Sequence, residues 1–232
     1  MKKILFIAVS ALASLSLNAL AGDLTGTVSF KGTAPAESDY SEKLQSDANC
    51  AALYSGTFPT THFYAVSASG GLGDVVVSIK GLPAASGDKA KPAVLDQKGC
   101  LYVPTILAVQ TGQKIVVKNS DPCVHNVHTV PKENEMQNQL QAPGSADLNF
   151  SFDKPEPFLK FQCDVHPWMF AWVTVVENQY FAVSDKDGKF TIKGVPPGKY
   201  TVEFAHRKLG TKTVEVEVKD SGATQDYTFE AK

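Results

Sequence analysis

Short runs of β-branched and aromatic residues recur along most of this chain, and they constrain its fold more than any other feature. In the run from Val214 to Val218, valine alternates with glutamate, as is typical of a strand with one face in the core and one in water. Clusters of glycine, proline, asparagine and aspartate separate the runs and indicate turns. The predicted strands are 75–79, 114–118, 147–152, 158–162, 172–176, 200–204 and 213–218. Many short strands with frequent turns predict an all-β fold, a sandwich or a barrel, in which only 37–53 has weak helical character.

The first residues predict export. Lys2 and Lys3 precede an apolar stretch from Ile4 to Leu17, and Ala19-Leu20-Ala21 supplies the small residues of a cleavage site. This pattern is typical of a secretory signal peptide over residues 1–21. The apolar stretch is too short for a membrane anchor. We therefore expect a periplasmic or secreted protein with no membrane insertion.

The charge balance argues against nucleic acid or an anionic membrane as a partner. The formal net charge is −2, it becomes more negative once Lys2 and Lys3 are removed, and the sequence has no basic cluster. The sequence also has no G-x-S-x-G motif and no nucleophile with an evident base. We therefore do not expect an enzyme.

Four cysteines, Cys50, Cys100, Cys123 and Cys163, lie in the expected mature chain. In an oxidising compartment they predict disulfides, and the sequence allows more than one pairing. One hypothesis is therefore a sandwich that is stapled only by disulfides, holds no metal, and serves adhesion or carbohydrate binding.

Two patches of sequence offer ligands for a metal ion. Cys163, His166 and Met169 stand at Cys-x-x-His-x-x-Met spacing between two predicted strands, and His125 follows another predicted strand. A loop held between strands presents such side chains to one point. Two histidines, one cysteine and a weak axial methionine are the ligand set of an electron-transfer copper site. We expect one copper ion, as Cu(I) or Cu(II), bound by His125, Cys163, His166 and Met169.

The same residues carry a family resemblance. The run from Asn119 to Val127, together with the Cys163-x-x-His166-x-x-Met169 loop, resembles the cupredoxin family, and the short ligand loop is similar to that of amicyanin. The segment 95–104 resembles exported proteins related to methylamine utilisation, and the segment 187–202 resembles the carboxypeptidase-regulatory-like β-sandwich. The resemblance implies a cupredoxin Greek-key β-sandwich plus a smaller prealbumin-like β-sandwich. It also implies a type 1 copper protein that transfers single electrons between redox partner proteins.

On this resemblance the chain divides into a signal peptide and three further parts. These are a strand and connecting segment at 22–60, a cupredoxin-like domain at 61–177 and a carboxypeptidase-regulatory-like sandwich at 178–232. The strand 24–31 is expected to complete the last sandwich. Within that sandwich Asp185 to Gly188 resembles the start of a calcium loop. Pro196 stands where such a loop needs its glutamate, so a hairpin turn is expected.

The cysteine assignments leave an alternative open. A bridge between Cys123 and Cys163 would remove the thiolate ligand. If Cys163 instead binds the metal, Cys50 and Cys100 are the expected bridge, and the loop they close stabilises the fold by roughly 4 kcal/mol in the chain-entropy model.

Other functions also remain open. Cys123-x-His125 with Cys163-x-x-His166 offers the ligands of a closed, structural zinc site. The soft donors suit periplasmic copper trafficking as well as electron transfer. His128 is either hydrogen-bonded near the site or a supplementary ligand, since it shares a strand face with His125.

Overall fold

The computed structural model describes residues 21–84, 87 and 90–231. The expected signal peptide, 1–21, lies outside the described residues except for Ala21. Within the ranges described, no helix is long and apolar enough to cross a membrane. Two short helices, α1 (Ser41–Gln45) and α2 (Ala48–Ala51), fall in the one stretch with helical character. The remaining elements are strands, and each predicted strand overlaps an observed one, so the all-β fold class is confirmed.

Strands from the middle of the chain form one β-sandwich, here called the central sandwich. Its strands are β3 (Ala93–Gln97), β4 (Tyr102–Val103), β5 (Ile106–Gln110), β6 (Ile115–Asn119), β7 (His125–Val130), β8 (Asn138–Gln141), β9 (Leu148–Phe150), β10 (Glu156–Gln162) and β11 (Phe170–Val176). One sheet has the order β5-β11-β10-β7-β8 and the other β4-β3-β6-β9. The pairs β5/β11 and β3/β6 are parallel, and the others are antiparallel.

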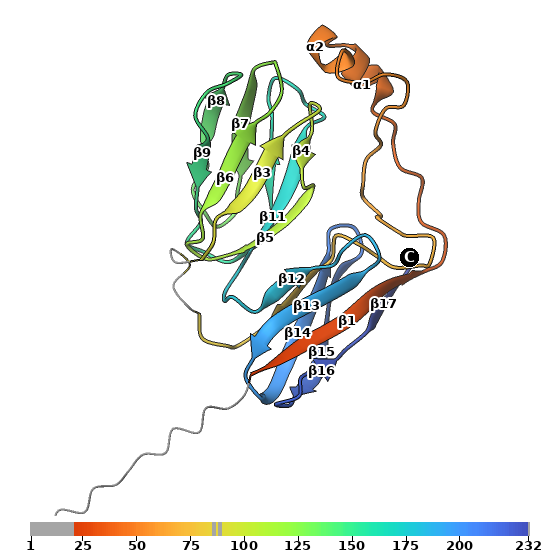
Figure 1. The fold of residues 1–232 in the computed structure, drawn as a ribbon, viewed down its shortest axis with the longest axis vertical. Coiled ribbons are helices and arrows are strands. Elements are labelled where there is room, and N and C mark those ends of the chain that lie inside the picture. Colours follow the sequence, from red (N-terminus) through yellow and green to blue (C-terminus); the bar gives the residue numbers. More distant parts are fainter. Residues whose placement is uncertain (1–20, 85–86, 88–89, 232) are drawn as a thin grey trace, which may run out of the picture.

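Strands from both ends of the described chain form a second unit, the terminal sandwich. Its strands are β1 (Gly22–Lys31), β2 (Val76–Ile79), β12 (Phe181–Val183), β13 (Lys189–Val195), β14 (Gly198–His206), β15 (Gly210–Val218), β16 (Ala223–Thr224) and β17 (Tyr227–Glu230). β1 pairs with β13, β16 and β17, and the opposite sheet has the order β12-β2-β14-β15. In Figure 1 this sandwich lies below the central one.

The sheets divide the chain differently from the boundary expected at residue 61. β2 was assigned by sequence to the cupredoxin-like segment 61–177, yet it pairs with β12 and β14 in the terminal sandwich. The segment 22–60 is also divided, because β1 lies in the terminal sandwich while Leu44 and Cys50 of the helices are buried in the core of the central one. The physical reason is that a short apolar strand such as β2 fits either sandwich, and its pairing partners lie far away in the sequence.

Each sandwich has its own core, and a smaller apolar seam joins the two. The central core includes Phe161 and Val173, and the terminal core includes Leu24 and Phe204. The seam is formed by buried residues of both units: Val76, Ile106, Ala108 and Val176. The outer face of β5 and β11 therefore packs on the terminal sandwich. The predicted ligand loops lie at the end of the central sandwich that is remote from this seam.

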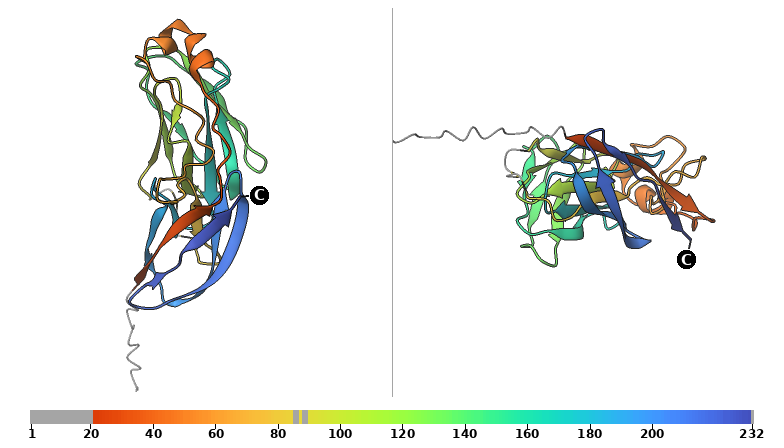
Figure 2. Two further views of the ribbon diagram at one scale, coloured as in Figure 1. Left: turned by 90° about the vertical axis from the view of Figure 1, so that its right-hand side faces the viewer. Right: turned by 90° about the horizontal axis from the view of Figure 1, so that it is seen from below.

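The two helices lie at that opposite end. Figure 2 shows them at the tip of the elongated molecule, far from the terminal sandwich. A disulfide between Cys50 of α2 and Cys100, in the turn before β4, attaches them there.

The sequence Asp185 to Gly188 forms a turn between β12 and β13. Gly188 has φ of 78°, a conformation that favours glycine. The Asp185 carboxylate accepts hydrogen bonds from the backbone N–H of Asp187 and Lys189, each at 2.9 Å. The side chain is thus used to close a hairpin, as expected.

Candidate metal centre

Three of the four predicted ligands come from one loop at the helix-covered end of the central sandwich. The loop joins β10 to β11 and contains Cys163, His166 and Met169, while His125 begins the neighbouring strand β7. Two backbone hydrogen bonds close the loop. The N–H of Met169 donates to the carbonyl of His166 (2.8 Å), and the N–H of Cys163 donates to the carbonyl of Met169 (3.2 Å). The loop is therefore tight and anchored on two paired strands.

The two imidazoles and the thiol converge. Nδ1 of His125 lies 2.9 Å from Nδ1 of His166, and Sγ of Cys163 lies 3.8 Å from Nδ1 of His166. The ligand atoms of all three residues lie within 4.8 Å of one another, and all three side chains are buried. An ion with bonds of about 2.0 Å to nitrogen and about 2.3 Å to sulfur spans both measured separations.

Met169 lies at the end of the same loop. Its side chain is fully buried and belongs to the same core cluster as Cys163. Its position in the loop is compatible with the predicted axial role, which stays a prediction.

The outward nitrogen of each imidazole faces a carboxylate. His125 Nε2 donates to Asp121 Oδ2 at 2.9 Å, because a carboxylate can only accept. The Nε2 hydrogen is thereby used, so the Nδ1 lone pair of His125 is left to point at His166 and Cys163. On the other ring, His166 Nε2 lies 3.6 Å from Asp47 Oδ2. Carboxylates in this position fix the ring orientation and raise the basicity of the ligand nitrogen.

Asp121 also organises the turn that carries the disulfide. Its two carboxylate oxygens accept from the backbone N–H of Gly99 (2.6 Å) and Cys100 (2.8 Å). Cys100 has φ of 52°, a strained value for a residue with a side chain. One buried carboxylate thus stabilises both the strained turn and the ligand ring.

The surroundings of Cys163 favour its thiolate. Burial alone raises its pKa, but the neighbouring rings of His125 and His166, and hydrogen bonds from the backbone N–H of Asn126 and His166 (each 3.4 Å from Sγ), lower the pKa to about 6. The thiolate is the form that binds metals. For His125, burial lowers the pKa, while the contacts with Asp121 and Cys163 outweigh burial and raise it.

Asn126 ties the ligand loop to β7. Its Oδ1 accepts from the backbone N–H of Asp164 at 2.6 Å, and its Nδ2 donates to the Asp164 carboxylate at 2.9 Å. His128 donates from Nδ1 to the same carboxylate at 2.9 Å, and this hydrogen bond is the largest cause of the lowered pKa of Asp164. His128 therefore has the hydrogen-bonding role that was one of its two interpretations.

Two cysteines form a disulfide and two are free thiols, which is what the metal-site interpretation requires. Cys50 and Cys100 form the predicted disulfide, and Cys123 and Cys163 are both free thiols. The bridge between Cys123 and Cys163 is thus not formed, and a fold with every cysteine paired is contradicted. Burial, reinforced by the carboxylates of Asp121 and Asp47, raises the pKa of Cys123 to about 11.

The helices cover the ligands. Asp47 accepts hydrogen bonds from the backbone N–H of Asn49 (2.8 Å) and Cys50 (3.1 Å), which caps the start of α2, and its other oxygen faces His166. The ring of Trp168 is tilted by 56° to that of His166, with ring centroids 5.1 Å apart, and its Nε1–H donates to the carbonyl of Cys100 at 3.1 Å. As a result His166 is only 2% exposed.

Sequence reasoning missed the roles of Asp121, Asp47 and Asn126. A signal existed for Asp121, which stands four residues before His125 in a turn-forming run. Asp47 gave none, because its segment lies far from the ligands in sequence and reaches them only through the fold.

The donor chemistry fits copper. A cysteine with a stabilised thiolate, two imidazoles whose free nitrogens meet, and a thioether in the same loop form the soft mixed set that suits Cu(I) and Cu(II). Burial keeps bulk water from the position where these atoms meet.

Comparison with known proteins gives one family match. Residues 166–232 match the model of the carboxypeptidase regulatory-like domain. The match starts in the ligand loop and includes β11, which pairs within the central sandwich. No protein of curated function matches the chain by sequence.

Several solved structures are similar to part of the chain. The copper-containing nitrite reductase of Thermus scotoductus SA-01 is 22% identical, with a TM-score of 0.35, over 41% of this chain and 25% of that one. A Cu(I) amicyanin variant is 19% identical, with a TM-score of 0.33, over 43% of this chain and 98% of amicyanin. The purple cupredoxin of Nitrosopumilus maritimus is 22% identical, with a TM-score of 0.31, over 36% of this chain and 99% of that one. The aligned part thus spans about a quarter of the nitrite reductase. The chain is similar to carboxypeptidase regulatory-like domains in its C-terminal part and, over less than half of its length, to cupredoxins.

Proposed function

We propose that this chain is an exported mononuclear copper protein that transfers single electrons between redox partner proteins. The observation that carries the proposal is the convergence of His125, Cys163 and His166 at one buried point. Met169 is the proposed axial ligand. The copper ion would supply a one-electron couple between Cu(I) and Cu(II).

The protein's own residues hold the geometry of the site. Asp121 keeps the hydrogen of His125 on Nε2, and the backbone N–H groups of Asn126 and His166 stabilise the thiolate of Cys163. A site fixed in this way changes little between oxidation states, which keeps the reorganisation that accompanies electron transfer small. The deep burial of His125 and Cys163 favours this role over copper delivery, because a delivered ion has to leave easily.

Redox partners are proposed to dock at the end of the central sandwich near His166. A groove there is bordered by Pro122, Val124, Pro143 and Val165. Val124 and Val165 are exposed large apolar side chains. An apolar rim of this kind suits a transient protein partner.

The decisive experiment is absorption and EPR spectroscopy of the Cu(II)-loaded protein. We expect an intense thiolate-to-copper band and a narrow copper hyperfine splitting, both lost in Cys163→Ser. The matched control is Cys123→Ser, which removes the other free thiol and should keep the band. A colourless Cu(II) complex of the wild-type protein would contradict the proposal, and a metal content of zinc in protein purified without added copper would favour the structural zinc site.

A further inference from the structure

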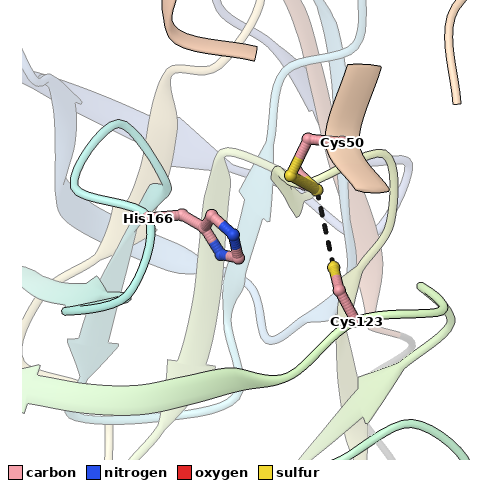
Figure 3. A group of neighbouring side chains, drawn as sticks. Cys50, Cys123 and His166 are labelled. Atoms are coloured by element: carbon pink, nitrogen blue, oxygen red, sulfur yellow. Dashed lines mark hydrogen bonds between the residues drawn. A yellow bond between two sulfur atoms is a disulfide. The ribbon is translucent and has the colours of Figure 1, made fainter. Parts of the chain in front are cut away.

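A second group of metal-binding atoms lies beside the proposed copper centre. The sulfurs of Cys50, Cys100 and Cys123 and a ligand nitrogen of His166 all lie within 4.8 Å of one another, and all four side chains are buried. Figure 3 shows Cys50 within the disulfide, Cys123 facing the other sulfur of that bridge, and the ring of His166 beside them, with the three labelled residues on separate segments of the chain. Cys163, the thiolate of the copper centre, is not a member of this group.

The third sulfur of the group touches the disulfide without taking part in it. Sγ of Cys123 lies 3.8 Å from Sγ of Cys100. A tetrahedral ion with metal–sulfur bonds of about 2.3 Å holds its sulfur ligands about 3.8 Å apart. Cys100 and Cys123 thus already have the spacing of two thiolates on one ion. The sulfur of Cys50 would be the third ligand, but it is bonded to Cys100 in the disulfide.

We propose that reduction of the Cys50–Cys100 disulfide creates a second metal site, formed by the thiolates of Cys50, Cys100 and Cys123, for a soft ion such as Cu(I). The reductant is a dithiol, which gives two electrons and two protons to the bridge and itself becomes a disulfide. The ion then replaces the proton on each sulfur that binds it, and those protons pass to solvent. Soft thiolate ligands select Cu(I) over harder ions.

The supports of two of the sulfurs do not depend on the bridge. The Cys100 turn is held by Asp121, and Trp168 donates to the Cys100 carbonyl. The Asn119 side chain donates to the carbonyl of Cys123 at 2.9 Å. None of these contacts involves the sulfur atoms, so we expect Cys100 and Cys123 to keep their positions when the disulfide is cleaved.

A path leads to the group from outside. A groove of about 360 Å³ is lined by Asp47, Cys123 and His166 among others. It reaches Cys123 directly, whereas Cys50 and Cys100 do not line it and are fully buried, so a reductant that enters here has to displace α2 locally to reach the disulfide. Because His166 reaches both groups, an ion in either site changes the surroundings of the other.

The test is a Cu(I) titration against a colorimetric Cu(I) chelator, under anaerobic conditions, on the disulfide-bonded protein and on protein reduced with dithiothreitol and then desalted. We expect the reduced form to bind one more Cu(I) per chain. Cys123→Ser leaves the disulfide intact, and after reduction it should bind the additional Cu(I) at least about 10-fold more weakly, since one of three thiolates is gone.

Cys163→Ser separates this inference from the proposed function. It removes the thiolate of the copper centre, so it should abolish the thiolate-to-Cu(II) band while the additional Cu(I) of the reduced form persists. Mass spectrometry after alkylation gives a second readout, in which bound Cu(I) protects Cys50, Cys100 and Cys123 together. Reduced protein that binds no more Cu(I) than the disulfide-bonded form, binding that is equal in Cys123→Ser, or loss of the β-sheet circular dichroism on reduction would each overturn the inference.

Discussion

At the scale of single residues, Asp121 joins two parts of the site that the sequence keeps apart. It accepts hydrogen bonds from the disulfide turn at Gly99 and Cys100 and from the ring of His125. Its buried charge is balanced by these donors, and His125 is held in the tautomer that directs the Nδ1 lone pair toward His166 and the proposed metal position. Among the residues outside the proposed ligand set, Asp121 is therefore the one whose substitution should lower metal affinity most.

Asp121→Asn should weaken copper binding by about 10–100-fold, as is typical when a partner of a ligand histidine is changed. The amide can still accept from one backbone N–H, so the fold should persist, but it leaves His125 without its negative partner. Competition titration with a copper chelator measures the affinity. Asp147→Asn, at an exposed aspartate before β9, is the matched control and should bind copper as the wild-type protein does.

A second residue-scale prediction concerns Asn126. Asn126→Ala removes the acceptor for the backbone N–H of Asp164 and a donor to its carboxylate. Because these partly buried groups lose their partner, the free energy of unfolding should fall by about 1–3 kcal/mol.

Urea unfolding of the metal-free protein measures this change. Asn149→Ala, at an exposed position of β9, should change the free energy of unfolding by less than about 0.5 kcal/mol. An equal loss in both variants would show that Asn126 does not anchor the ligand loop.

At the scale of elements, part of the strand set was predictable and the pairing was not. Alternation such as that of Val214 to Val218 reports which face of a strand is buried, so β15 could be predicted from local sequence, as were β1, β2, β6, β9, β10, β11 and β14, whereas the other nine strands of the described residues were not predicted. The pairing of β2 with β14 and the contact of Asp47 with His166 depend on long-range packing, which no local pattern encodes. The ligand loop between β10 and β11 was predictable because its three donors are close in sequence.

The turn between β14 and β15 contains a pH-sensitive element. His206 ends β14, is 1% exposed, and accepts through Nδ1 from the backbone N–H of Lys208 (3.3 Å) and Leu209 (3.2 Å). Burial lowers its pKa to about 4. In the unfolded chain a histidine has a pKa of about 6.5.

Between pH 6.5 and 4 the unfolded state therefore binds a proton at His206 that the folded state does not. The neutral, buried His206 therefore contributes up to about 3 kcal/mol to the free energy of unfolding. This contribution is complete above about pH 6.5 and is lost as the pH falls toward 4. In His206→Gln, whose side chain stays neutral, the free energy of unfolding should depend less steeply on pH across this window. Thermal or urea unfolding at a series of pH values tests this, and parallel pH profiles for the two proteins would contradict it.

At the scale of the whole molecule, the two sandwiches meet through a small apolar seam. Ile106, Ala108 and Val176 of the central sandwich pack with Val76 of β2. Beside the seam, the Arg207 guanidinium lies 4.0 Å from the centre of the Trp172 ring. The ligands lie at the far end of the central sandwich, so the seam and the metal centre should respond independently to mutation.

Ala108→Glu buries an unpaired charge in the seam, and it should separate the unfolding of the two sandwiches. We expect calorimetry to show two transitions for Ala108→Glu and one for the wild-type protein, while the thiolate-to-copper band keeps its position. Val94→Glu, at a strand position that is 46% exposed, serves as the control and should leave the calorimetric trace unchanged. A copper band altered by Ala108→Glu would contradict the separation of seam and site.

The pairing of β1 and β2 with later strands has a consequence for biosynthesis. The ribosome makes β1 and β2 first, but their partners (β13, β16 and β17 for β1, and β12 and β14 for β2) emerge only after every strand of the central sandwich. The strands of the central sandwich, β3 to β11, are contiguous in the chain. When the last of them has been synthesised, only β1 and β2 of the terminal sandwich have been made. β1 and β2 therefore remain unpaired edges until β12, β13 and β14 have been made, and it is during this interval that the nascent chain most needs protection from aggregation.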